Sequence, residues 1–214
     1  MNHRDLVLGR VRRALADVPR EELPGQTPLA RDYLRVHGDR TPEESAALLA
    51  THLTDYRAHV HHCGTDELPA VLARLMAQRG SRSAVVPAGV PDAWLPGDIE
   101  RVRDSPAMTP HDLDAVGSVV TGCAVAIAET GTLVLDASPD QGRRRITLVP
   151  DHHICVVRVP VQVVDSVPQA LERLDPARPQ TWISGPSATS DIELDRVEGV
   201  HGPRTLDVVL LAES

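Results

Sequence analysis

The sequence of 214 residues contains no lysine and no phenylalanine, and its only large aromatic side chains are Trp94, Trp182, Tyr33 and Tyr56. Without lysine the chain can form neither a Schiff base nor the lysine contact of a phosphate-binding P-loop. The few aromatic rings leave little surface for base stacking, and a formal net charge of -8 opposes binding to a phosphate backbone. We therefore expect no nucleic acid among its partners.

Cysteine is also scarce. Cys63, Cys123 and Cys155 are widely spaced and form no Cys-x-x-Cys pair, so they indicate neither an iron–sulfur cluster nor a disulfide framework. No apolar run approaches the roughly 18 residues of a membrane span, and charged residues interrupt the N-terminal stretch every few positions. These features favour a cytoplasmic protein with reduced thiols and no membrane span.

The N-terminal part of the chain carries an amphipathic segment followed by a proline-rich one. Leu8, Val11 and Leu15 recur at three- and four-residue spacing, which predicts a helix over residues 3–18. Residues 19–42 contain four prolines and two glycines, which interrupt regular structure. We therefore divide the chain into an N-terminal helix and arm, residues 1–42, and a main domain, residues 43–214.

A second helix is predicted to begin at Thr41, where Thr-Pro-Glu-Glu supplies an N-cap and acidic residues in the first turn, and to run to about His62. His59 could then share a helix face with His62 or Cys63, but two ligands do not make a metal site and no nearby residue completes one. Asp151-His152-His153 resembles a metal-binding triplet of some phosphoesterases, yet the further acidic motifs of such a site are absent. We predict no metal site.

Helical and short apolar segments alternate along the rest of the chain, which predicts an α/β protein. The expected helices cover residues 65–79 and 166–174, with a helical turn at 112–116, and the expected strands cover 83–87, 147–150, 153–159, 180–184 and 206–211.

The stretch Gly117–Ser138 places a single acid, Glu129, between two apolar runs of small and β-branched residues. Glu129–Thr132 has the composition of a hairpin connection with Gly131 at positive φ. A hairpin tip can also project into a cleft. In a dry pocket the pKa of Glu129 would rise, which suits proton abstraction next to a carbonyl or formation of an acyl anhydride. Glu129 is therefore a catalytic candidate as well as part of a turn.

Two later loops have the composition of a ligand cradle. Ser184–Asp191 is rich in small and hydroxyl residues and follows a predicted strand, which suits an anion or a carbonyl oxygen as well as a plain Gly-Pro turn. His201–Arg204 offers an imidazole and a guanidinium on a rigid turn, which suits acid–base chemistry and anion binding as well as a turn held by a histidine hydrogen bond.

Arginine is the third candidate feature. Residues 143–145 are consecutive arginines, which can bind carboxylate or phosphate beside a cleft, whereas for two of the three a solvated loop is an equal alternative. The predicted catalytic residues are Glu129 and His201, and the predicted substrate-binding residues are Thr130, Gly131, Thr132, Arg145, Ser184, Gly185, Ser187, Thr189, Asp191 and Arg204.

Four motifs, in the same order, resemble the LUD-domain family, in its lactate-utilization protein C branch. They are AIAETGTLVL at 126–135, TLVPDHHICVV at 147–157, WISGPSATSDIE at 182–193 and VEGVHGPRTLDVVLL at 197–211. The resemblance implies a fold like that of the NagB/RpiA/CoA-transferase group, a sheet of mostly parallel strands flanked by helices. It also implies a role in oxidising L-lactate to pyruvate, together with iron–sulfur partner proteins. The branch looks like the member without redox centres, so we expect no cofactor in this chain.

Three functions remain open from the sequence. The first is a component of a lactate-oxidising complex that binds a small carboxylate at the predicted residues. The second is a stand-alone CoA-transferase-like or sugar-phosphate-isomerase-like enzyme, which rests on fold analogy alone. The third is a non-catalytic assembly or regulatory subunit, in which the N-terminal helix and arm dock on a partner.

Overall fold

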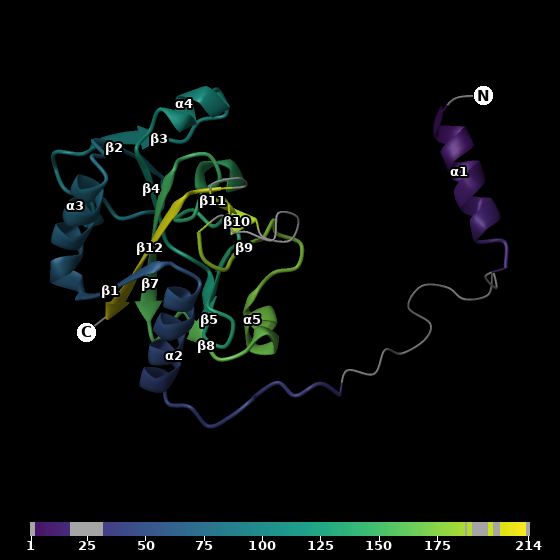
Figure 1. The fold of residues 1–214 in the computed structure, drawn as a ribbon, viewed down its shortest axis with the longest axis horizontal. Helices are drawn as coiled ribbons and strands as arrows, with labels where there is room; N and C mark the ends of the chain where they lie inside the picture. The colour runs from purple at the N-terminus through teal and green to yellow at the C-terminus, as the bar shows by residue number, and fades with distance from the viewer. Residues whose placement is uncertain (1–2, 18–31, 187, 190–196, 199–201, 213–214) are drawn as a thin grey trace. The chain divides into compact units, whose positions relative to one another are not determined.

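The computed structural model describes residues 3–17, 32–186, 188–189, 197–198 and 202–212 (Figure 1). The chain divides into two compact units, Met1–Leu34 and Arg35–Ser214. In the first unit, helix α1 (His3–Ala14) forms where the apolar spacing predicts it, and none of its residues is buried. No helix among the described residues is long and apolar enough to cross a membrane.

The second unit is built on a six-stranded sheet in which every neighbouring pair of strands is parallel. This confirms the predicted α/β class with a parallel sheet. In spatial order the strands are β1 (His59–Gly64), β12 (Thr205–Ala212), β7 (His152–Val159), β4 (Ser118–Thr121), β2 (Ser83–Val86) and β3 (Glu100–Arg103).

A smaller mixed sheet packs beside the first. Its central pair, β5 and β6, is antiparallel and joined by residues 128–131, which confirms the predicted hairpin. In spatial order its strands are β8 (Val163–Val164), β5 (Val125–Ile127), β6 (Thr132–Leu135) and β9 (Thr181–Ile183). Two further short strands, β10 (Ala188–Thr189) and β11 (Val197–Glu198), form an antiparallel two-stranded sheet.

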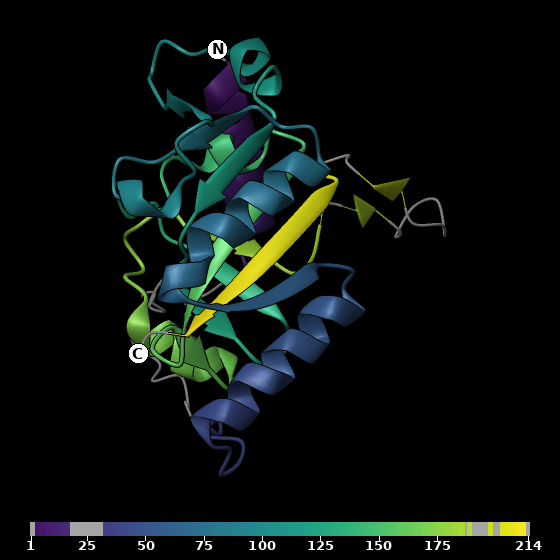
Figure 2. The same ribbon diagram turned by 90° about the vertical axis from the view of Figure 1, so that its left-hand side faces the viewer.

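Helices cover both outer faces of the two sheets. Helix α3 (Leu68–Gln78) lies against one face of the large sheet (Figure 2). Its Leu72 and Met76 side chains are buried in this contact. The opposite face packs on the small sheet together with Leu49 and Leu53 of α2 (Pro42–Asp55). The remaining helices are α4 (Pro110–Asp114) over the β2–β4 region and α5 (Val167–Arg173) over the outer face of the small sheet, with 3-10 turns η1 (Thr65–Glu67), η2 (Asp92–Trp94) and η3 (Arg144–Thr147).

Helix α2 begins as predicted and ends earlier. The Thr41 hydroxyl accepts a hydrogen bond from the backbone N–H of Glu44 at 3.2 Å, and the Glu44 carboxylate accepts one from the Thr41 N–H at 2.8 Å. The helix ends at Asp55, and Arg57 adopts a positive φ of 67°. The predicted helix end at His62 is therefore wrong. The histidines of 59–62 belong to β1, a polar edge strand that has no apolar alternation to reveal it.

The predicted strand at 147–150 is also wrong. Ile146 and Thr147 are buried in η3, and the chain then turns into β7. The apolar residues of this segment pack against α4 and the β2–β4 region without pairing in a sheet. A short apolar run does not by itself distinguish a strand from a buried turn.

Candidate functional site

Glu129 lies at the hairpin tip, but its carboxylate is held by residues that precede α2. Oε2 lies 2.7 Å from Nδ1 of His37, and Oε1 accepts a hydrogen bond from Arg40 at 3.0 Å. Burial raises the pKa of Glu129, but the hydrogen bonds from His37 and Arg40 outweigh it and hold the pKa below its ordinary value. The condition for a raised pKa is therefore not met at Glu129, because its carboxylate is paired with His37 and Arg40 and does not lie in a dry pocket.

We call residues 35–40 the strap, because several contacts fasten this segment to the hairpin and α5. The Ser166 hydroxyl donates to the Arg35 carbonyl at 2.9 Å, and the Arg35 guanidinium pairs with Glu172 at 2.8 Å. Arg40 also lies 3.7 Å from the Asp165 carboxylate. A segment with the composition of a loose arm is thus bound to the main unit by its charges.

The hairpin turn meets the loop after β9 through hydroxyl groups. Thr130 donates to the Thr132 hydroxyl at 2.8 Å, and the Thr132 and Ser184 hydroxyls lie 2.8 Å apart. Three predicted substrate-binding residues are thereby brought together. Thr130 also lines a separate hollow, together with Glu129 and residues at the end of α2.

Two of the predicted substrate-binding residues are glycines that allow the end of α2 to approach these turns. A Cβ at Gly131, which has φ 55°, would lie 2.9 Å from the carbonyl carbon of His52. A Cβ at Gly185, which has φ 83°, would lie 2.4 Å from the carbonyl oxygen of Tyr56. Both positions therefore require glycine for conformation and for space.

A cavity of about 300 Å³ lies where the amino ends of β7 and β12 face β9 of the small sheet, and we call it the inter-sheet cavity. It contains Ser184 and Gly185 from the predicted cradle and Gly202 from the second predicted loop. The remaining lining residues are Arg144, Thr147, Leu148, His153, Thr181, Trp182, Ile183, Pro186, Pro203 and Leu206.

Among the three consecutive arginines, only Arg144 lines this cavity. Arg143 forms an ion pair with Asp104 at 2.5 Å and donates to the Ser105 carbonyl, while Arg145 donates to the Met108 carbonyl. No described residue forms an ion pair or hydrogen bond with the exposed Arg144 guanidinium. The arginine cluster thus divides into two structural residues and one available cation.

His153 lies against the same cavity and is only 1% exposed. Its Nε2 lies 2.8 Å from the Thr121 hydroxyl, and no described residue bonds to Nδ1. Burial, reinforced by the neighbouring His152, lowers the pKa of His153 to about 3, so the imidazole is neutral near pH 7. A neutral imidazole can donate or accept one hydrogen bond at Nδ1.

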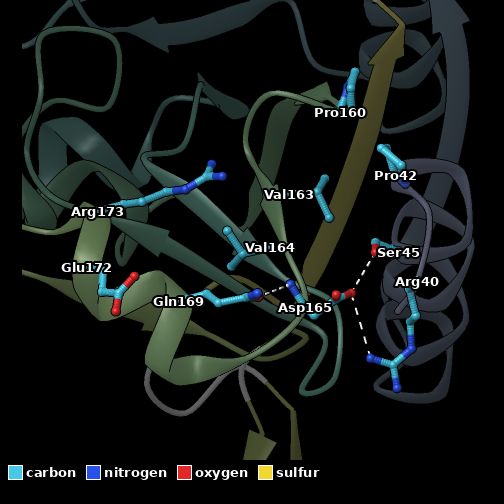
Figure 3. A pocket seen from close by; sticks show the side chains of 10 residues that line it. All are labelled: Arg40, Pro42, Ser45, Pro160, Val163, Val164, Asp165, Gln169, Glu172 and Arg173. Atoms are coloured by element: carbon cyan, nitrogen blue, oxygen red, sulfur yellow. Dashed lines mark hydrogen bonds and ion pairs between the residues drawn. The ribbon is translucent and has the colours of Figure 1, made fainter. Parts of the chain in front are cut away.

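A second cavity, of about 390 Å³, lies under the strap (Figure 3). Its charged side chains are already partnered. The Asp165 carboxylate accepts from the Ser45 hydroxyl at 2.6 Å and faces Arg40, Arg173 donates to the Val161 carbonyl, and Glu172 pairs with Arg35. This cavity therefore offers a charged ligand less than the inter-sheet cavity does.

The other predicted site residues lie elsewhere or outside the described part of the chain. Arg204 pairs with Asp151 at 3.1 Å on the surface, and neither it nor Arg145 lines the inter-sheet cavity. Thr189 is described only as part of β10. Ser187, Asp191 and His201 lie outside the described residues.

A buried polar network crosses the large sheet on its α3 side. The two carboxylate oxygens of Asp207 lie 2.6 Å from Nε2 of His61 and 2.9 Å from Nε2 of His152, whose Nδ1 lies 2.8 Å from the Ser118 hydroxyl. This serine–histidine–aspartate order resembles a hydrolase triad, but Ser118 is fully buried and lines none of the cavities described above. The network therefore ties four adjacent strands together.

Sequence reasoning overlooked this network, although one signal was available. Asp207 is the only charged residue within the apolar run 206–211, and an isolated acid in a buried strand requires partners. Neither this network nor any other group of three or more histidine, cysteine or acidic side chains among the described residues has the arrangement of a metal site.

Comparison with known proteins places this chain in a family. A model described as the LUD domain matches residues 109–211. A lactate utilization protein C of Deinococcus radiodurans is 43% identical over 213 residues, which cover 96% of this chain and 93% of that protein. A protein of the same name from Geobacillus kaustophilus is 30% identical over 170 residues, which cover 69% of this chain and 70% of that protein.

A solved structure agrees with these matches. A DUF162 family protein from D. radiodurans has a TM-score of 0.70 and 37% sequence identity to this chain, and the match covers 81% of this chain and 99% of that one. The chain belongs to the LUD-domain family. Within this family it is a homologue of lactate utilization protein C.

Proposed function

We propose that this protein is a component of an L-lactate utilization system, which oxidises L-lactate to pyruvate together with iron–sulfur partner proteins. The observation that carries the proposal is the 43% identity, over 96% of this chain, to a protein named lactate utilization protein C. The redox chemistry belongs to the partners in this proposal, because the three cysteines form no cluster-binding motif. The proposed location is the cytoplasm.

We further propose that the parallel sheet with its appended hairpin is of the NagB/RpiA/CoA-transferase kind. A stand-alone CoA transferase of that fold needs a glutamate free to form an acyl anhydride. Here the Glu129 carboxylate is paired with His37 and Arg40, which argues against this second function.

The experiment is growth of a strain that lacks this gene. It should fail to grow on L-lactate and grow normally on pyruvate, because only the oxidation of lactate requires the complex. The wild-type gene supplied on a plasmid should restore growth on lactate. Normal growth of the deletion strain on L-lactate as sole carbon source would contradict the proposal.

The partner claim is tested separately by purification of the tagged full-length chain from lactate-grown cells. Iron–sulfur proteins should co-purify, with the visible absorbance of their clusters. Recovery of the chain alone under the same conditions would count against a stable complex.

A further inference from the structure

We propose that the inter-sheet cavity binds a small 2-hydroxy or 2-oxo monocarboxylate, with Arg144 holding the carboxylate and His153 the neighbouring oxygen. The choice of this ligand class rests on the proposed function, whereas the position of the site rests on the cavity itself.

The size and lining of the cavity suit a small organic acid. Its volume of about 300 Å³ is at the lower end of ligand sites. Its walls combine one cation with the apolar surfaces of Leu148, Ile183 and Leu206. A phosphate monoester carries nearly two charges and three strong acceptor oxygens, so one arginine would satisfy it poorly. A monocarboxylate with a small apolar group matches both features.

Arg144 supplies the carboxylate contact. Its neighbours Arg143 and Arg145 are held by the Asp104–Met108 loop, which fixes the η3 turn and places the intervening side chain at the cavity. A guanidinium can bind a carboxylate through two parallel hydrogen bonds. Because no described residue pairs with Arg144, a ligand does not have to displace an internal partner.

His153 can serve both oxidation states of such an acid. The Thr121 hydroxyl can donate to Nε2 or accept from it, so the imidazole can present Nδ1 as an acceptor or as a donor. An acceptor suits the hydroxyl of a 2-hydroxy acid, and a donor suits the carbonyl of the 2-oxo acid. A cationic imidazole could only donate, and burial of His153 keeps the ring neutral.

The test uses Trp182, which lines the cavity and is one of only two tryptophans. The other, Trp94, packs on the α3 side of the large sheet. In the full-length Trp94→Tyr protein, titration with L-lactate or pyruvate should change the fluorescence of Trp182 in a saturable manner. Acetate, which lacks the second oxygen, should bind more weakly, and inorganic phosphate should not compete.

The matched variants are Arg144→Gln and Arg79→Gln. Both arginines are exposed and have no described partner, and Arg79 lies at the end of α3 away from the cavity. Arg144→Gln should weaken lactate binding about tenfold or more, whereas Arg79→Gln should bind like the parent. Equal binding by the two variants, no saturable response to either acid, or tighter binding of phosphate than of lactate would overturn the proposal.

These outcomes separate the site from the proposed function. If the purified protein binds lactate through Arg144 but the deletion strain grows on lactate, the function fails and the site stands. If the deletion strain cannot use lactate and the protein binds neither acid, the function stands and the site fails.

Discussion

Nδ1 of His37 lies 2.7 Å from Oε2 of Glu129, a contact between residues 92 positions apart in the sequence. The acid that stands out most clearly in the sequence therefore anchors the strap. The Glu129 carboxylate and the His37 side chain lie at the surface of the hairpin tip, with the Glu129 side chain 22% exposed.

Replacing Glu129 with glutamine should loosen the strap. The substitution removes the charge that His37 and Arg40 face, at a cost of about 1 kcal/mol, or roughly fivefold faster opening. Hydrogen exchange followed by mass spectrometry should show faster exchange in peptides covering residues 35–40, with the rest of the domain unchanged. Glu100→Gln, at an exposed acid of β3 without a described partner, is the control. Unchanged exchange in the strap of Glu129→Gln would refute the anchoring role.

The buried Asp207 network should contribute much more to the stability of the protein than the exposed pair of Asp151 and Arg204 does. Asp207→Asn leaves His61 and His152 without their carboxylate, and losing two buried hydrogen bonds to a charged group costs about 3 kcal/mol or more. Asp151→Asn removes a carboxylate from the exposed pair with Arg204 and should cost about 1 kcal/mol or less. Urea denaturation at neutral pH measures both, and similar losses in the two variants would contradict the structural role of the network.

The stability of the protein should fall in mild acid because of His153. Its pKa is lowered to about 3, so the unfolded chain takes up a proton below about pH 6.5 that the folded chain does not. This contribution is fully present above pH 6.5 and is lost as the pH falls towards 3. Between pH 7 and 5 the wild type should lose about 2 kcal/mol more than His153→Gln. Denaturation curves at the two pH values provide the comparison, and equal losses would show that His153 is not buried in neutral form.

Gly185 should be far less tolerant of alanine than Gly80. Both have positive φ, but a Cβ at Gly80 meets open space and a Cβ at Gly185 meets the Tyr56 carbonyl. Both alanine variants carry the same cost of a positive φ. The difference between their free energies of unfolding therefore measures the close approach of Gly185 to α2, and we expect it to be about 2 kcal/mol. Thermal or urea unfolding of the two variants tests this, and equal destabilisation would mean that the loop can move away from α2.

The sequence predicted the elements whose patterns are local. The capping residues Thr41 and Glu44 predicted the start of α2, and the Glu129–Thr132 turn predicted the hairpin. The edge strand β1 was mistaken for helix because its histidines carry no alternation, and pairing with β12 overrides local preference. Local pattern cannot reveal strand order, since that depends on contacts between distant segments.

The residues that line the inter-sheet cavity were predictable only in part. Ser184 and Gly185 were predicted from the small, polar loop after a strand and the arginine cluster from its charge, and of these Ser184, Gly185 and Arg144 line the cavity. Which arginine is available depends on Asp104 and the Met108 carbonyl, contacts made some 37 to 39 residues away in sequence. Likewise, the partners of Glu129 come from a segment whose prolines and charges resemble those of a free arm.

A role of Arg144 in lactate utilization is tested most directly by growth on L-lactate of strains that carry Arg144→Gln or Arg79→Gln in the chromosomal gene, with pyruvate as the parallel carbon source. We expect the Arg144→Gln strain to grow poorly on lactate and normally on pyruvate at wild-type protein levels, and the Arg79→Gln strain to grow normally on both. Wild-type growth of the Arg144→Gln strain on L-lactate would contradict this role.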